Sequence, residues 1–287
     1  MDKLSPENFE TNSLLRAVDA VDESYTTSID PILFRGPCKR QSKTEGGENV
    51  KHLLLRITPG INVNIKLTAV ISGASGLIGL QLLNCLAVQP NWASIIVLTR
   101  RKLDIPERFT QVITDLDRMD DVASQLKADV AFCCLGTTLK QAGSRSQFER
   151  VDYGYALRFA QITQKQGAHH FLLVSAVGAD PDAAFFYSRT KGRLERDVAK
   201  LDWQRLTVMK PSLLLGQRQE HRFAEHMAAR LSGLIKPLWH GRLAIYHPIE
   251  ATQVAQAMAQ KAIEPATMRQ ENLFYPQIIQ SARRFGV

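Results

Sequence analysis

The fold is decided by the stretch Leu67-Thr-Ala-Val-Ile-Ser-Gly-Ala-Ser-Gly-Leu-Ile-Gly79. The apolar run from Leu67 to Ile71 is typical of a buried strand, and the residues from Leu77 to Leu86 suit a helix. A strand, a glycine turn and a helix in this order place backbone N–H groups at a helix N-terminus, where they can bind a phosphate. The stretch therefore predicts a βα unit that can hold a dinucleotide.

The three glycines of this stretch have different expected roles. Gly73 permits the tight turn, Gly76 lets the backbone approach a pyrophosphate, and Gly79 lets the helix pack closely on the strand. The other loop residues expected to contact the cofactor are Ser75, Leu77 and Ile78. The spacing is G-x-x-G-x-x-G rather than G-x-G-x-x-G, so the loop alone is also compatible with a structural turn that binds nothing.

Strands and helices alternate after the glycine loop. Strands are predicted at 67–72, 94–99, 111–114, 129–135, 170–175 and 206–209, and helices at 77–89, 120–126, 148–166 and 187–201. Such alternation indicates a parallel sheet with both faces covered. Because crossovers are right-handed, the expected fold is α/β, a Rossmann-type doubly wound parallel sheet.

The pattern changes after Pro211. A helix is predicted at 219–235, a short strand at 243–247 and a helix at 250–263, followed by Asn272–Phe274 and a C-terminal tail. With so few strands, the segment 212–287 is expected to contribute a small substrate lobe over the strand ends. The NAD(P)-binding Rossmann domain as a whole is expected to span 63–287.

Residues 1–62 form a different kind of segment. They are polar and turn-rich, above all between residues 36 and 50, and their beginning lacks the basic and apolar regions of a secretory signal peptide. Two interpretations stay open. The segment is either a flexible N-terminal extension or upstream sequence wrongly included in the reading frame.

Composition excludes several classes of function. The net charge is +8, with −1 in residues 1–62 and +9 in residues 63–287. A basic domain suits an anionic cofactor or substrate, whereas no basic run interleaved with aromatic residues predicts nucleic-acid binding. The most apolar window, 67–89, is interrupted by glycine and polar residues, so no membrane span is expected.

The four cysteines are Cys38, Cys85, Cys133 and Cys134, and they show neither a C-x-x-C pair nor a zinc-ligand spacing. Adjacent Cys133 and Cys134 would point to opposite faces of a strand, which argues against a disulfide between them. We therefore expect reduced cysteines, no metal site and a cytoplasmic protein.

Arg100 and Arg101 directly follow the predicted strand 94–99. Many NAD-binding folds carry Asp or Glu here, which accepts hydrogen bonds from the ribose hydroxyls. Two guanidinium groups suit a 2′-phosphate instead, although arginines at a strand end can also be plain solvated charges. Their position about 20–30 residues after the glycine loop favours the phosphate role. The sequence thus predicts NADP(H) rather than NAD(H).

A turn of small residues, Leu135-Gly136-Thr137, follows the predicted strand 129–135. Such a turn at this strand end lies close to the dinucleotide in doubly wound folds. Gly136 would allow close approach of the backbone.

Ser175, Tyr187 and Lys191 form the candidate catalytic set. Ser175 ends the predicted strand 170–175, at the edge where ligands bind in open α/β sheets. The run Tyr187-Ser-Arg-Thr-Lys191 places a phenol and an ammonium on one helix face. We expect Lys191 to lower the Tyr187 pKa, so that Tyr187 can exchange a proton with a substrate oxygen that Ser175 binds. Lys191 would also reach the nicotinamide ribose.

From about residue 66 to residue 265 the chain resembles the short-chain dehydrogenase/reductase superfamily, in its atypical, extended-like branch. Its stretches similar to TAT-interacting-protein-like oxidoreductases are Cys134-Leu-Gly-Thr-Thr138, Val151-Asp-Tyr153, 171–180 and 211–220. The resemblance implies a Rossmann fold, NADP(H) binding by the glycine loop and the two arginines, and catalysis by Ser175, Tyr187 and Lys191. It also places these residues near the cofactor: Leu135, Pro211, Leu214 and Arg218.

The resemblance has one departure that concerns the chemistry. Many family members carry Asn where this chain has Asp152, and if that Asn completes a proton relay, Asp152 changes or abolishes it. We expect an NADPH-dependent oxidoreductase that acts on a small carbonyl or alcohol substrate, as a monomer or homodimer. The alternative is a non-catalytic NADPH-binding regulator or redox sensor. A nucleotide-sugar epimerase would need a larger substrate lobe.

Overall fold

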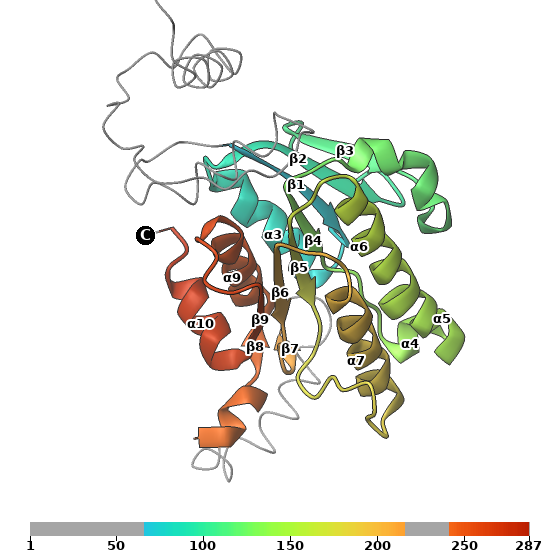
Figure 1. The fold of residues 1–287 in the computed structure, drawn as a ribbon, viewed down its shortest axis with the longest axis vertical. Helices are drawn as coiled ribbons and strands as arrows, with labels where there is room; N and C mark the ends of the chain where they lie inside the picture. Colours follow the sequence, from blue (N-terminus) through green and yellow to red (C-terminus); the bar gives the residue numbers. More distant parts are fainter. Residues whose placement is uncertain (1–65, 216–240, 287) are drawn as a thin grey trace, which may run out of the picture. The chain divides into compact units, whose positions relative to one another are not determined.

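A parallel sheet of seven strands forms the centre of the part of the chain described by the computed structural model, residues 66–215 and 241–286 (Figure 1). Its strands are β1 (Leu67–Ser72), β2 (Trp92–Thr99), β3 (Phe109–Ile113), β4 (Val130–Cys133), β5 (His170–Val174), β6 (Arg205–Met209) and β9 (Gln270–Leu273). They lie in the order β3-β2-β1-β4-β5-β6-β9. The direction of the strand order therefore reverses between β1 and β4, the point where doubly wound sheets bind their ligands.

Helices cover both faces of the sheet (Figure 1). One layer consists of α3 (Leu77–Val88), α9 (Ala251–Ile263) and α10 (Tyr275–Arg283). The other consists of the 3₁₀ helix η2 (Leu116–Leu126), α6 (Ala156–Lys165) and α7 (Phe186–Ala199). In β1, Ala69 and Ile71 pack in the first core and Val70 in the second, as the two-residue period of a strand requires. The expected doubly wound α/β fold is confirmed.

The long helix predicted at 148–166 is three consecutive elements in the structure. They are α5 (Arg145–Glu149), the π-helical turn η3 (Arg150–Tyr155) and α6. The short helix α4 (Leu139–Ala142) precedes them. The wider π turn lies where Asp152 is buried, with its residue surface only 1% exposed. π-turns within helices occur frequently at functional sites.

The C-terminal region differs from the small lobe predicted for 212–287. β9 pairs in parallel with β6, from Leu206 opposite Gln270 to Met209 opposite Leu273, so it extends the main sheet. Helices α9 and α10 contribute to the same core as α3. A separate two-stranded ladder is formed by β7 (Leu214–Leu215) and β8 (Ile249–Glu250).

The strand predicted at 243–247 is wrong, because the 3₁₀ helix η5 (Gly241–Tyr246) occupies this segment. The His247 N–H donates to the Ala244 carbonyl at 3.2 Å, which closes the turn. The His247 ring stacks on Tyr275 of α10, with ring centroids 4.5 Å apart. Short apolar runs do not distinguish strand from helix by periodicity alone. The helix predicted at 219–235 and the extension 1–62 lie outside the described residues.

Among residues 66–215 and 241–286, no helix has the length and apolar character needed to cross a lipid bilayer.

Candidate active site

The glycine loop packs tightly against the end of β4. Gly73 has a φ of +84°, and a Cβ atom added there would lie 2.4 Å from the carbonyl carbon of Cys134. A Cβ on Gly79 would lie 2.2 Å from the Gly73 carbonyl oxygen. Among the described residues no side chain caps α3, whose N-cap is Gly76, so no side-chain cap occupies the N–H groups of its first turn. Side chains at Gly73 and Gly79 would force the loop away from β4 and from α3, so these glycines allow the close packing. The N–H groups at the start of α3 are of the kind that suit an anionic phosphate.

Arg100 and Arg101 lie at the same edge of the sheet as the glycine loop. Ser72, the last residue of β1, is opposite Leu98 of β2, so the arginines follow just beyond the neighbouring strand. Both are exposed. The Thr99 hydroxyl donates to the Arg101 carbonyl at 2.8 Å, which fixes the turn that carries them.

Lys191 is buried in an ion pair with Asp152. Its Nζ lies 2.7 Å from Asp152 Oδ1, and the two side chains are only 5% and 1% exposed. The other carboxylate oxygen, Oδ2, accepts a 2.8 Å hydrogen bond from the Thr137 backbone N–H. A Cβ on Gly136 would lie 3.7 Å from the Lys191 Nζ, so the Gly136 backbone passes close to the ammonium. The turn after β4, the π-helical turn and α7 therefore meet at one place.

Tyr187 lies in the first turn of α7, one turn before Lys191 on the same face. Its ring packs against Phe148 of α5, with centroids 5.7 Å apart. The residue as a whole is 40% exposed, and partial burial of its phenol group raises the Tyr187 pKa. Lys191 lowers it and Asp152 raises it, and the net direction is upward. The lowered pKa expected from the sequence is wrong, because burial and the carboxylate of Asp152 outweigh the ammonium.

Ser175 is held by a second carboxylate on α7. Its hydroxyl donates a 2.5 Å hydrogen bond to Glu195 Oε1, and Glu195 Oε2 pairs with Lys210 Nζ at 2.7 Å. The Ser175 backbone N–H donates to the Met209 carbonyl at 2.8 Å, so the residue follows β5 directly beside the end of β6. In this arrangement the Ser175 proton points to Glu195, and its oxygen remains an acceptor.

Three of the other residues predicted to contact the cofactor, Leu135, Thr137 and Pro211, lie around the same strand ends. Pro211 accepts a 2.9 Å hydrogen bond from the Val177 N–H, next to Ser175. The Leu135 N–H group lies against Gly73, and Thr137 contacts Asp152. Leu214 belongs to the separate β7–β8 ladder. Arg218 lies outside the described residues.

Glu195, Lys210 and Gly192 were missed by reasoning from the sequence. Glu195 could have been found, because Tyr187, Lys191 and Glu195 repeat at one-turn intervals on one helix face. Gly192 has no local signal: a Cβ there would lie 2.1 Å from the carbonyl carbon of Asp180, in a segment that only the tertiary fold brings to α7. Within the described residues, the His, Cys, Asp and Glu side chains form no group that could hold a metal ion.

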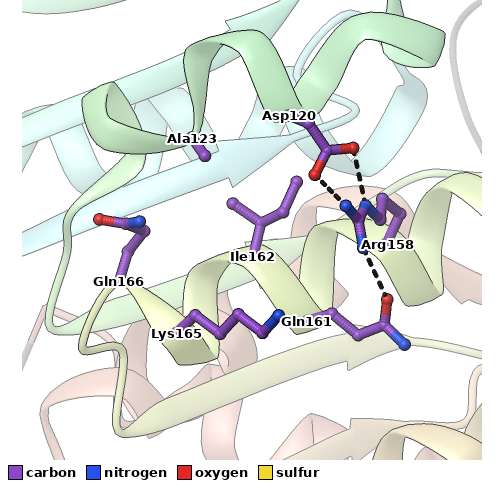
Figure 2. Close-up of a pocket in the computed structure, with 7 residues that line it drawn as sticks. All are labelled: Asp120, Ala123, Arg158, Gln161, Ile162, Lys165 and Gln166. Carbon is purple, nitrogen blue, oxygen red and sulfur yellow. Dashed lines mark hydrogen bonds and ion pairs between the residues drawn. The ribbon is translucent and has the colours of Figure 1, made fainter.

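A surface hollow between η2 and α6 is separate from these residues. Figure 2 shows Arg158 reaching across it to Asp120 and also contacting Gln161 of its own helix. Its other lining residues are Ala123, Ile162, Lys165 and Gln166. None of the predicted site residues lines it, so we assign it no part in the candidate active site.

Residues 69–259 match the NAD dependent epimerase/dehydratase family. The chain belongs to this family. Protein HTATIP2 of Rattus norvegicus is 33% identical over 228 residues, which cover 78% of this chain and 92% of the relative. Protein FMP52, mitochondrial, of Candida albicans is 32% identical and covers 67% of this chain and 88% of the relative.

Solved structures share the fold at low sequence identity. The Bordetella bronchiseptica enzyme WbmG in complex with NAD has a TM-score of 0.56 and 12% identity, and the match covers 75% of this chain and 74% of that one. The UDP-glucuronic acid 4-epimerase from Bacillus cereus in complex with NAD has a TM-score of 0.53 and 11% identity, with 72% and 77% covered. These likenesses support a Rossmann-type fold.

The cytoplasmic location expected from the sequence is contradicted. The FMP52 relatives from Candida albicans, Debaryomyces hansenii and Saccharomyces cerevisiae are all named as mitochondrial proteins. Reduced cysteines were a poor basis for that expectation, because free thiols do not distinguish one reducing compartment from another.

Proposed function

We propose that this protein is an NADP(H)-dependent oxidoreductase that acts on a small carbonyl or alcohol substrate. The observation that carries the proposal is the position of Lys191. Its ammonium is buried against Asp152 and Gly136 at the end of β4, one turn after Tyr187. A protonated tyrosine and a buried lysine at the carboxyl ends of a doubly wound sheet are suited to proton transfer at a bound oxygen.

Each group has a distinct part in the proposed mechanism. The cofactor, when bound, supplies hydride chemistry. The first-turn N–H groups of α3 would hold its pyrophosphate, and Gly136 would allow close approach of the backbone to it. Tyr187 donates a proton to the carbonyl oxygen, or accepts one from an alcohol in the reverse direction. Ser175, whose own proton is donated to Glu195, presents only an acceptor oxygen to a bound substrate.

Replacement of Tyr187 by phenylalanine tests the catalytic proposal. We expect Y187F to lower kcat by about 10²- to 10⁴-fold, because it removes the only atom proposed to carry the proton, while NADPH affinity changes little. Aldehydes, ketones and quinones would be screened by loss of NADPH absorbance, with NADPH binding measured by fluorescence. Y155F is the matched control, since the Tyr155 hydroxyl donates to Asp117 at the surface. Turnover that survives Y187F unchanged would refute the proposal.

Arg100 and Arg101 are proposed to select NADP(H) over NAD(H). We expect the double variant R100D/R101A to weaken NADPH binding by about ten- to hundredfold, the loss typical of one or two hydrogen bonds to a charged group. NADH binding should change much less, because that cofactor has no 2′-phosphate. K102A is the control, as Lys102 is the next exposed cation in the same turn. Equal losses for the two cofactors in a binding titration would contradict the phosphate role.

A non-catalytic NADPH-binding regulator is the second candidate function. The geometry that favours it is the hydrogen bond from Ser175 to Glu195, because a carbonyl substrate needs donors and this donor is already used. Both functions require cofactor binding, so turnover distinguishes them. NADPH binding without Y187-dependent turnover of any carbonyl in the screen would support the regulator.

A further inference from the structure

The Lys191–Asp152 pair has a consequence for the direction of proton transfer. We propose that Asp152 is a positioning residue whose carboxylate compensates the Lys191 charge and keeps the Tyr187 hydroxyl protonated, which biases the site towards donating a proton to a carbonyl. The inferred bias towards carbonyl reduction rests on the function proposed above. The protonation state of Tyr187 is a property of the chain itself and can be tested without turnover.

The π-helical turn is what brings Asp152 to Lys191. Asp152 lies in the middle of η3 (Arg150–Tyr155), between two stretches of regular α-helix. There one carboxylate oxygen contacts Lys191 at 2.7 Å and the other accepts from the Thr137 N–H at 2.8 Å. Both oxygens are therefore committed to fixed partners, so the carboxylate is held in one orientation. A buried carboxylate with this geometry compensates the positive charge of Lys191. It also holds the Lys191 ammonium beside Gly136.

The effect reaches Tyr187 through Lys191. An isolated ammonium one turn away would favour the phenolate. With Asp152 in contact, the lysine presents an ion pair instead of a net charge. Burial raises the Tyr187 pKa, Lys191 lowers it and Asp152 raises it. The same carboxylate opposes the effect of burial on Lys191, whose pKa is raised although burial alone would lower it.

Two glutamates on the packed elements have partners of their own. Glu149 of α5 pairs with Arg193 of α7 at 2.5 Å, and Glu195 of α7 pairs with Lys210. The titratable groups that face Lys191 are therefore Asp152, Tyr187 and Cys133. Burial raises the pKa of the Cys133 thiol to about 11, so it is neutral at physiological pH. Asp152 is thus the anion that opposes the effect of Lys191 on the Tyr187 pKa.

The first test measures the Tyr187 proton directly. Tyrosinate absorbs in the near ultraviolet, and subtracting the titration of Y187F from that of the full chain isolates Tyr187. Subtracting the titration of D152N/Y187F from that of D152N gives the Tyr187 pKa in the absence of the Asp152 carboxylate. We expect the Tyr187 transition to move to lower pH by about one unit in D152N, because only the opposing ammonium remains. In the full chain Tyr187 should titrate before Lys191, since Tyr187 has the lower ordinary pKa and Asp152 raises the pKa of Lys191.

The matched control is D197N. Asp197 of α7 accepts a hydrogen bond from the Tyr153 hydroxyl of η3 at 2.9 Å, so this variant removes a carboxylate between the same two elements without touching Lys191. D197N should leave the Tyr187 transition in place, and D152E should return it towards the original pH. Circular dichroism melts of every variant show that each titration is made below its unfolding transition. A Tyr187 transition that is unchanged or higher in D152N, or that moves as far in D197N, would overturn the inference.

The second test uses the pH dependence of turnover. Carbonyl reduction should fall as the pH rises through the Tyr187 pKa, and alcohol oxidation should rise over the same range. In D152N the pH profiles of reduction and oxidation should both move to lower pH, by the same amount as the Tyr187 pKa measured in the titration. If no substrate turns over, the proposed function fails while the titration still decides the role of Asp152. If the pH profiles of turnover stay the same in D152N while the Tyr187 pKa shifts, the link between Asp152 and the direction of reaction is refuted.

Discussion

Lys191→Met is expected to lower the free energy of unfolding by about 3–5 kcal/mol, because it leaves the Asp152 carboxylate buried without its counter-charge. The two side chains are 5% and 1% exposed, so solvent screens the pair very little. The pKa of Lys191 is raised in the folded protein. Its contribution is therefore complete at neutral pH and is lost only as the pH rises through that raised value. Urea denaturation at pH 7 measures the loss.

The double variant K191M/D152N distinguishes the ion pair from loss of packing. Replacing both partners removes the uncompensated charge, and the asparagine can still accept from the Thr137 N–H that now bonds Asp152. We therefore expect K191M/D152N to be more stable than K191M alone. K200M is the control on the same helix, since the Lys200–Asp197 pair is at the surface, where such a pair contributes about 0.2–1 kcal/mol. A double variant less stable than K191M would contradict a buried ion pair as the cause.

The sequence predicts most of the sheet because six of its seven strands have a local signal. The bounds predicted for β1, 67–72, are those of the structure, and β5 and β6 differ by one residue. Buried parallel strands appear as short apolar runs between turns, as β1, β2, β4 and β5 do here. The seventh strand, Gln-Glu-Asn-Leu at Gln270–Leu273, has no such run. Its place beside β6 depends on tertiary packing, so the sequence pattern predicts a lobe outside the sheet for this segment.

The candidate site is less predictable for a related reason. Tyr187 and Lys191 are near in sequence, so helical periodicity alone puts them on one face. The partner of Lys191 comes from a π-helical turn on another helix, and helix propensity carries no signal for that turn. Without Asp152 in contact, a lysine one turn from a tyrosine predicts a lowered tyrosine pKa. The direction found is opposite because electrostatics depends on every neighbouring group, including those far away in sequence.

Gly73→Ala is expected to destabilise the protein by about 2–5 kcal/mol and to weaken cofactor binding. A left-handed backbone costs a residue with a Cβ about 1–2 kcal/mol, and overpacking in a filled site adds about 1–3 kcal/mol. Both apply at Gly73, whose φ is +84° and whose Cβ would lie 2.4 Å from the Cys134 carbonyl carbon. To relieve that overlap, the glycine loop has to move away from the end of β4. The proposed cofactor site lies between these two segments.

Gly143→Ala separates the two contributions. Gly143 has a similar φ of +76°, but a Cβ there would meet nothing within 4 Å. This variant should therefore lose only the backbone contribution of about 1–2 kcal/mol and keep its affinity for NADPH. Thermal unfolding and fluorescence titration of both variants measure the two effects. Equal destabilisation would show that backbone conformation alone explains Gly73. Unchanged NADPH affinity in Gly73→Ala would mean that the contact between this loop and β4 does not shape the cofactor site, and the phosphates would then have to bind elsewhere on the sheet edge.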